Sequence, residues 1–155
     1  MTHTITLAIT EGIATVTFNR ESKLNALDFE SFVQLDRIIK NLKKERALRL
    51  VIIDAKGSDF CTGLDVKNIT RKPLHMFKLL FKWLPGNANL VQRVTIGWQE
   101  LQVPVICKIH GRCFGGGMQI ALGADFRLCA ASAQLAIMES RWGLTPDMAG
   151  SLMLQ

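Results

Sequence analysis

Apolar and polar residues alternate along the first part of the chain, which is the pattern of half-buried β-strands. The alternation covers residues 4–9 and 13–18, and the segment between them, Thr10-Glu11-Gly12, contains a glycine suited to a tight turn. A helix is predicted next, because apolar residues recur at intervals of three and four between residues 27 and 44. A short run rich in β-branched residues follows at 48–53. The chain therefore begins with two strands, a helix and a third strand.

The rest of the chain continues this mixture of helices and strands around glycine-containing loops. Helices are predicted at 64–69 and 118–124, and strands at 104–109, 126–130 and 135–138. An amphipathic stretch at 74–84 belongs to a connection that we expect to be mobile and to lead into a helix ending near residue 101. The pattern predicts an α/β fold.

Composition narrows the class of protein. The chain has 155 residues, of which 48% are hydrophobic and 21% charged, so we expect a single domain over residues 1–155. Its apolar runs are too short to span a bilayer and its start lacks the basic residues of a signal peptide, so we expect a cytoplasmic protein with no membrane partner. The four cysteines form no CxxC pair, which favours free thiols and no metal site. A net charge of +6 suits an anionic partner.

Two glycine-containing loops carry the candidate chemistry, because each ends where a helix is predicted to begin. Backbone N–H groups are unpaired at a helix N-terminus and the helix dipole is positive there. If the loops at 57–63 and 115–117 converge, the amides of Thr62 and Gly116 could hold one carbonyl oxygen as an oxyanion hole. Either loop alone is a common structural turn, and the glycine run fits neither a phosphate-binding loop nor a dinucleotide fingerprint.

Three motifs, in this order and spacing, resemble the crotonase (enoyl-CoA hydratase/isomerase) superfamily. They are Asn19-Arg20 with Lys23-Leu24-Asn25-Ala26-Leu27, then Phe60-Cys61-Thr62-Gly63-Leu64-Asp65, and His110-Gly111-Arg112-Cys113-Phe114-Gly115-Gly116-Gly117. The resemblance implies a crotonase-like spiral of ββα units, with the C-terminal helical part absent from this chain. It also implies an acyl-CoA thioester substrate of fatty acid metabolism, and no cofactor other than the coenzyme A that is part of that substrate.

The resemblance assigns the candidate residues by their position in these motifs. It implies that Thr62 and Gly116 donate the two oxyanion hydrogen bonds. It also implies that coenzyme A lies along the chain at the four positions Lys23, Ala26, Leu64 and Asp65. Four further basic residues are candidates for phosphate contacts, with a solvated basic surface as the alternative: Arg20, Lys67, Arg71 and Lys72.

The reaction depends on three acid/base candidates. Hydratases of this superfamily use two carboxylates, at the positions that Gln119 and Glu139 occupy here. An amide can orient water but cannot titrate, so we expect an enoyl-CoA isomerase in which Glu139 shifts the double bond, with enoyl-CoA hydratase as an alternative. We expect Glu139 to be buried beside Met138, Trp142 and Leu144. Asp147 falls where dienoyl-CoA isomerases carry a further carboxylate and some dehalogenases a nucleophile, although it could instead cap a helix.

A non-enzymatic alternative and an assembly complete the expectations. The basic segment 40–46, with Arg49, resembles the lysine-rich helix of the crotonase-fold protein that binds AU-rich RNA, although cations at a helix C-terminus are also ordinary partners of its dipole. The resemblance implies a homotrimer or hexamer for the complete subunit. We expect the 155-residue chain alone to expose apolar surface and to bind coenzyme A weakly.

Overall fold

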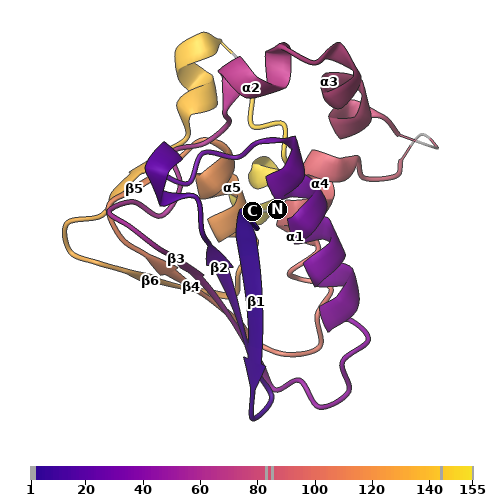
Figure 1. The fold of residues 1–155 in the computed structure, drawn as a ribbon, viewed down its shortest axis with the longest axis vertical. Helices are drawn as coiled ribbons and strands as arrows, with labels where there is room; N and C mark the ends of the chain where they lie inside the picture. Colours follow the sequence, from indigo (N-terminus) through magenta and orange to yellow (C-terminus); the bar gives the residue numbers. More distant parts are fainter. Residues whose placement is uncertain (1–2, 83, 85, 144, 155) are drawn as a thin grey trace.

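The computed structural model describes residues 3–82, 84, 86–143 and 145–154, and its centre is a five-stranded sheet (Figure 1). The strand order is β1-β2-β3-β4-β6, with β1 antiparallel to β2 and every other pair parallel. A two-stranded parallel sheet pairs β5 with β7. The strands are β1 (Ile5–Thr10), β2 (Ile13–Phe18), β3 (Leu50–Ala55), β4 (Val105–Ile109), β5 (Arg112–Phe114), β6 (Phe126–Cys129) and β7 (Gln134–Ala136).

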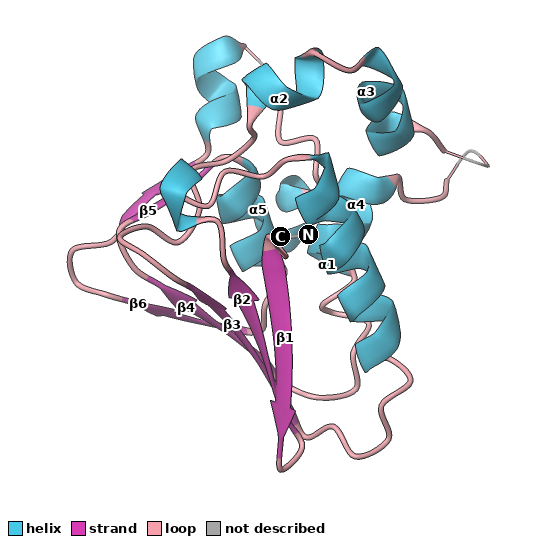
Figure 2. Cartoon of the chain, in the orientation of Figure 1, coloured by secondary structure: helices cyan, strands magenta, loops and turns pink. Residues whose placement is uncertain are grey.

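Helices cover one face of the larger sheet (Figure 2). The long helix α1 (Phe29–Leu42) begins two residues after the predicted start, because the Asp28 side chain accepts a hydrogen bond from the Ser31 amide and caps it. Beside α1 lies α4 (Leu90–Ile96), and α5 (Gly116–Leu122) starts inside the glycine run. Together these helices and the sheet enclose the core.

The helix predicted at 64–69 is observed as α2 (Val66–Thr70). The connection after it, which was expected to be mobile, contains the helix α3 (Pro73–Leu80), and α4 ends at Ile96, before the predicted residue 101. Among the described residues, no helix combines the length and the apolar character needed to cross a membrane. Three 3-10 helices complete the part of the chain that the structure describes: η1 (Glu21–Lys23), η2 (Met138–Trp142) and η3 (Gly150–Leu154).

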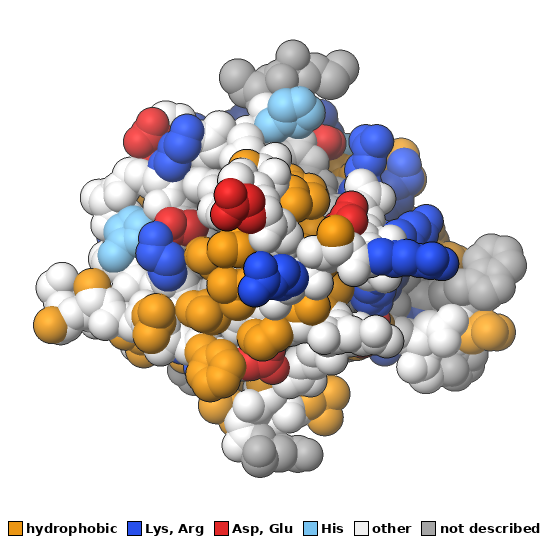
Figure 3. Space-filling model, turned by 90° about the horizontal axis from the view of Figure 1, so that it is seen from below, with side chains coloured by type: hydrophobic (Ala, Val, Ile, Leu, Met, Phe, Trp, Pro, Cys, Tyr) orange, Lys and Arg blue, Asp and Glu red, His pale blue; other side chains and the backbone are white. Residues whose placement is uncertain are grey.

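The core lies between the larger sheet and its helices. Val16 and Ile53 from neighbouring strands, Phe32 and Leu35 from α1, and Trp98 after α4 are each fully buried. The opposite face of the sheet carries exposed apolar side chains, including Ile13, Phe126 and Leu128. Seen from below, hydrophobic side chains gather near the middle of the molecule among charged ones (Figure 3). Exposed apolar patches often mark contact surfaces, and the trimer or hexamer stays a prediction.

Candidate functional site

The two glycine-containing loops lie against each other. Cys61 and Cys113 form a parallel β-bridge, and the Phe114 amide donates to the Cys61 carbonyl at 2.9 Å. Gly63 has a φ of +95°, which disfavours other residues, and a Cβ there would lie 3.2 Å from the Phe114 carbonyl oxygen and 3.8 Å from the Gly116 nitrogen. The convergence on which the oxyanion prediction depended is therefore present.

The second loop offers the amide that was predicted, and the first loop does not. Gly116 is the first residue of α5, and its amide has no acceptor among the described residues. The Thr62 amide, by contrast, donates to the Leu24 carbonyl at 3.2 Å, and its hydroxyl donates to the same oxygen at 3.1 Å. An amide that already donates a hydrogen bond to a backbone carbonyl is not free to bind a ligand. The geometry therefore does not support Thr62 as the donor.

An amide two residues further along the first loop is free. Leu64 forms a parallel bridge with Leu27, in which the Leu27 amide donates to Gly63 and the Asp65 amide donates to Leu27, at 2.7 and 2.8 Å. None of the hydrogen bonds between described residues uses the amide of Leu64 itself. The positive φ of Gly63 reverses the peptide direction between Thr62 and Leu64. Leu64 is thus the first-loop amide that a ligand could reach.

Glu139 is positioned beside these loops by a buried glutamine. Gln119, fully buried on α5, donates from its side-chain nitrogen to Glu139 Oε1 at 2.7 Å. Its oxygen accepts from the amides of Met148 and Gly150, both at 3.0 Å, and this pattern fixes the amide orientation. Glu139 Oε1 lies 3.6 Å from the Cβ position of Gly115. The other oxygen, Oε2, is buried and has no hydrogen-bond partner among the described residues, so it is available to a reacting proton.

The third acid/base candidate, Asp147, lies apart from this pair. Its side chain is exposed and makes no hydrogen bond or ion pair with another described residue, so it does not act as a helix cap. It lines a mainly apolar cavity that also contacts Leu64 and Met148. Of the apolar neighbours expected around Glu139, Met138 approaches the same glycine loop. Leu144 lies outside the described residues, as does the side chain of Trp142.

All four residues predicted to bind the substrate line one cavity of about 680 Å³. These are Lys23, Ala26, Leu64 and Asp65. The four further basic candidates line it too: Arg20, Lys67, Arg71 and Lys72. Asp65 is the single acidic residue among the lining residues, so the cavity is strongly basic. A basic concave surface of this size suits a phosphorylated ligand.

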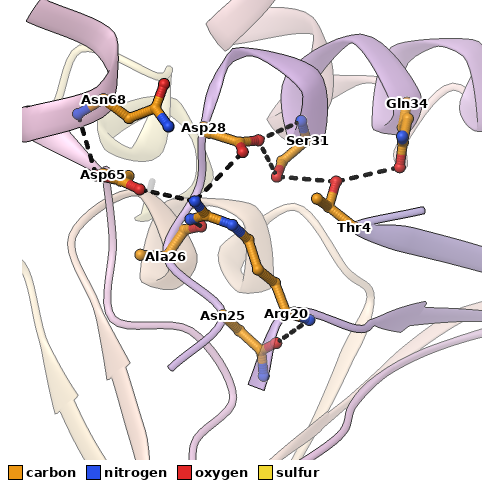
Figure 4. A network of polar contacts seen from close by, with 9 residues as sticks. All are labelled: Thr4, Arg20, Asn25, Ala26, Asp28, Ser31, Gln34, Asp65 and Asn68. Carbon is orange, nitrogen blue, oxygen red and sulfur yellow. Dashed lines mark hydrogen bonds and ion pairs between the residues drawn. The ribbon is translucent and has the colours of Figure 1, made fainter. Parts of the chain in front are cut away.

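Arg20 is tied to its neighbours rather than free in this cavity (Figure 4). Its guanidinium donates to the Ala26 carbonyl at 2.8 Å and to the Asp65 carboxylate at 2.9 Å, and a third contact reaches Asp28 at 3.5 Å. The two carboxylates in turn cap the N-termini of α1 and α2. Arg20 therefore joins the segment before α1 to the loop that carries Leu64. The sequence had suggested it only as a phosphate contact.

The buried cysteines do not add a reactive group. Burial raises the pKa of the Cys61 thiol to about 12, and burial also raises the pKa of Cys107 and Cys113. These thiols stay protonated at neutral pH and are poor nucleophiles. Within the described part of the chain, no group of three or more His, Cys, Asp or Glu side chains could hold a metal ion. The candidate chemistry therefore lies with the loop amides and carboxylates.

Comparison with known proteins gives a match along almost the whole chain. A family model described as enoyl-CoA hydratase/isomerase matches residues 8–155. The chain is 31% identical over 147 residues to the 1,2-epoxyphenylacetyl-CoA isomerase of Escherichia coli (strain K12), a match that covers 94% of this chain and 55% of that protein. The chain spans about half the length of the curated relatives it matches.

Solved structures share the fold. One described as an enoyl-CoA hydratase from Streptomyces coelicolor A3(2) matches with a TM-score of 0.83 and 33% identity, over 97% of this chain and 54% of that chain. Another, from Thermobifida fusca YX and in complex with acetoacetyl-CoA, matches with a TM-score of 0.79 and 26% identity, over 98% and 60% of the two chains. The crotonase-like α/β fold expected from the sequence is confirmed.

Proposed function

Since the chain belongs to the enoyl-CoA hydratase/isomerase family, we propose that it binds an acyl-CoA thioester and stabilises the enolate formed from it. The observation that carries this proposal is the convergence of the two loops, with the amides of Leu64 and Gly116, which have no acceptor among the described residues, beside Glu139. Two N–H donors aimed at one oxygen stabilise the negative charge that develops there. In this proposal Leu64 replaces Thr62 as the first donor.

The basic cavity is proposed to hold coenzyme A. Its phosphates would lie near Lys23, Lys67, Arg71 and Lys72, which form no ion pair with other described residues. Leu64 lines this cavity and also carries the proposed donor, so a thioester held by its amide would extend the coenzyme directly into the basic region. The related Thermobifida fusca protein was solved with acetoacetyl-CoA, which agrees with this class of ligand.

The proposed reaction is a double-bond shift with Glu139 as the only base. Glu139 takes a proton from carbon 2 of a 3-enoyl thioester, and the electrons move onto the thioester oxygen held by the two amides. The same proton is then returned at carbon 4, which gives the 2-enoyl product. Gln119 supports this role because its side-chain nitrogen hydrogen-bonds the ionised carboxylate while its own amide stays neutral. Water addition would need a second titratable group.

Asp147 supports a second candidate reaction. Its carboxylate lines the apolar cavity that also touches Leu64, so it would face a part of the acyl group beyond the thioester. A reaction of the dienoyl-CoA isomerase or dehalogenase type would use Asp147 as base or nucleophile. The two candidates therefore differ in which carboxylate is essential.

The homotrimer or hexamer and the cytoplasmic location stay predictions.

Substitution of each carboxylate separates the two reactions. Glu139→Gln keeps the acceptor for Gln119 but removes the base, so turnover of a 3-enoyl-CoA should fall about 10²-fold or more with coenzyme A binding largely unchanged. Asp147→Asn should cost far less, and serves as the matched control. Turnover is measured by the absorbance of the conjugated product and binding by calorimetry. Unchanged turnover in Glu139→Gln, together with its loss in Asp147→Asn, would contradict the isomerase proposal and favour the second reaction.

A further inference from the structure

A second cavity, of about 230 Å³, lies next to the basic one. Its walls come from the first loop and from α2, α3 and α4, and include the apolar residues Leu64, Val66, Ile69, Met76, Leu79 and Val91. Thr70 and Asp147 are the only polar residues among those that line it. The lining offers no cation and little hydrogen bonding, so an apolar occupant fits it best.

The two cavities meet at the proposed thioester position. Leu64 and Val66 line both of them, and Leu64 also carries the amide proposed as the first donor. A thioester whose oxygen is bound by that amide has coenzyme A on one side of its carbonyl carbon and the acyl group on the other. The basic cavity suits the first of these parts, and the apolar cavity is the adjoining space for the second.

We propose that this apolar cavity holds the first six to eight carbon atoms of an uncharged acyl group, an inference that rests on the proposed acyl-CoA function. A volume of 230 Å³ holds roughly eight non-hydrogen atoms at about 30 Å³ each, the volume of a water molecule in the liquid. Shorter acyl groups leave part of the apolar wall in contact with water. Longer ones must extend past the rim, where they bury no further surface.

Charge sets the second limit on the acyl group. An acyl chain ending in a carboxylate would lose hydration in the apolar cavity and meet no cation among the lining residues. It would also approach Asp147, the one charged residue there, which repels an anion. The cavity therefore selects monocarboxylic over dicarboxylic acyl-CoA esters of the same length.

Calorimetric titration of the protein with saturated acyl-CoA esters, which cannot react, measures both limits. From butyryl-CoA to octanoyl-CoA the Kd should fall about fourfold for each added CH2, and it should then stay constant through dodecanoyl-CoA. Adipoyl-CoA, which matches hexanoyl-CoA in length but ends in a carboxylate, should bind roughly tenfold more weakly or worse. A Kd that is independent of chain length, or equal for hexanoyl-CoA and adipoyl-CoA, would overturn the inference.

A pair of tryptophan variants on α3 tests whether this cavity is responsible. Met76 lines the cavity and is 38% exposed, so Met76→Trp can fill the space without replacing a core residue. Leu74 is 61% exposed and is not among the lining residues, which makes Leu74→Trp the matched control. Met76→Trp should move the plateau to shorter acyl chains, and Leu74→Trp should not. An unmoved plateau in Met76→Trp refutes the assignment. Failure of coenzyme A itself to bind would refute the proposed function, and this inference with it.

Discussion

A buried glutamine distinguishes the proposed double-bond shift from water addition at this site. Gln119 donates to Glu139 at 2.7 Å and is held from behind by two backbone amides, so its geometry is fixed. A glutamate at position 119 could keep both backbone hydrogen bonds. Its second oxygen would then lie beside Glu139, and two carboxylates so close share a proton. The site would acquire the second titratable group that water addition requires.

Gln119→Glu should therefore raise hydration of crotonyl-CoA by about tenfold or more over the unmodified protein, because a second acid/base group becomes available. Hydration is followed by the loss of absorbance of the conjugated thioester. Gln134→Glu, in β7, makes the same chemical change on an exposed strand and should leave hydration unchanged. Rapid hydration by the unmodified protein would show that position 119 does not decide the reaction.

Another carboxylate, Asp59, stabilises the fold near the first loop. Its oxygens accept from the amide, Nε and Nη2 of Arg112 at 2.9, 2.6 and 2.9 Å. The hydrogen bonds from Arg112 hold the pKa of Asp59 well below its ordinary value, although burial alone would raise it. A lowered folded-state pKa stabilises the protein above the unfolded pKa of about 3.9, and this stabilisation is lost as the pH falls further.

The free energy of unfolding should thus decrease between about pH 4 and pH 2, and Asp59→Asn should lessen that decrease. Urea unfolding at several pH values measures it. A residual slope will remain in the variant, because the pKa of Asp36 is also lowered in the folded protein. Burial raises the pKa of Asp36, but hydrogen bonds and charge from Arg93 and Lys40 lower it by more. Glu100→Gln, at an exposed position, should keep the slope of the unmodified protein. Identical slopes for Asp59→Asn and the unmodified protein would contradict the assignment.

At the scale of elements, Arg20 connects the chain before α1 to the loop before α2. It binds the Ala26 carbonyl and the Asp65 carboxylate, and Asp65 directly follows the proposed donor Leu64. Its side chain is 16% exposed, and its planar guanidinium donates hydrogen bonds to both partners. Arg20 is thus placed to position the proposed oxyanion hole, and its effect on turnover should exceed its effect on coenzyme A affinity.

Arg20→Lys keeps the charge but cannot make both contacts, so kcat should fall about tenfold while the Kd for coenzyme A changes less than about threefold. The Arg20→Lys and Asp65→Asn changes should also be non-additive in a double-mutant cycle, because each removes the same contact. Lys67→Met, which removes a cavity charge outside this network, should instead raise the Kd and leave kcat nearly constant. If Arg20→Lys keeps both the kcat and the Kd of the unmodified protein, Arg20 acts only as a phosphate contact.

The strands and the long helix could be predicted because local patterns determine them. Alternation identified β1 and β2, and the helical period identified α1, within a few residues of the observed bounds. The helix predicted at 64–69 is present as α2, whereas α3 and α4 were harder to predict, since each is too short to show a clear period. Met138 was predicted as the end of a strand, but it begins the 3-10 helix that carries Glu139.

The site was predictable as a set of segments, but its hydrogen bonding was not. The motifs brought Gly116, Gln119 and Glu139 together because their order resembles a known family. Which first-loop amide is free depends on the positive φ of Gly63 and on the pairing of Leu64 with Leu27, which are properties of the folded backbone. The prediction of Thr62 failed for this reason. A glycine next to a candidate donor is a signal that the neighbouring amides point in different directions.

At the scale of the whole molecule, the net charge is +6, and the two basic regions differ in how many of their side chains form ion pairs. At the end of α1, Lys40 pairs with Asp36 at 2.7 Å and Lys43 pairs with Glu100, so part of the basic helix end proposed for RNA is already satisfied. The basic cavity differs, because Lys67 and Lys72 form no ion pair with another described residue. Unpaired cations in a concave surface attract an anionic ligand more strongly than paired cations on a helix end.

Two charge-removing pairs test which basic region binds the anionic partner. Replacing both Lys67 and Lys72 by alanine should weaken coenzyme A binding about tenfold, because two charges near the phosphates are lost. Replacing Lys44 and Arg46, at exposed positions after α1, removes the same charge and should change the Kd little. Binding of coenzyme A should also weaken as salt is raised from low to physiological concentration, since exposed charges are screened.

Titration with an AU-rich oligoribonucleotide tests the end of α1 as an RNA-binding surface. Tight RNA binding that is abolished by the Lys44 and Arg46 changes, with coenzyme A binding absent, would establish the non-enzymatic alternative, because only that function depends on the end of α1.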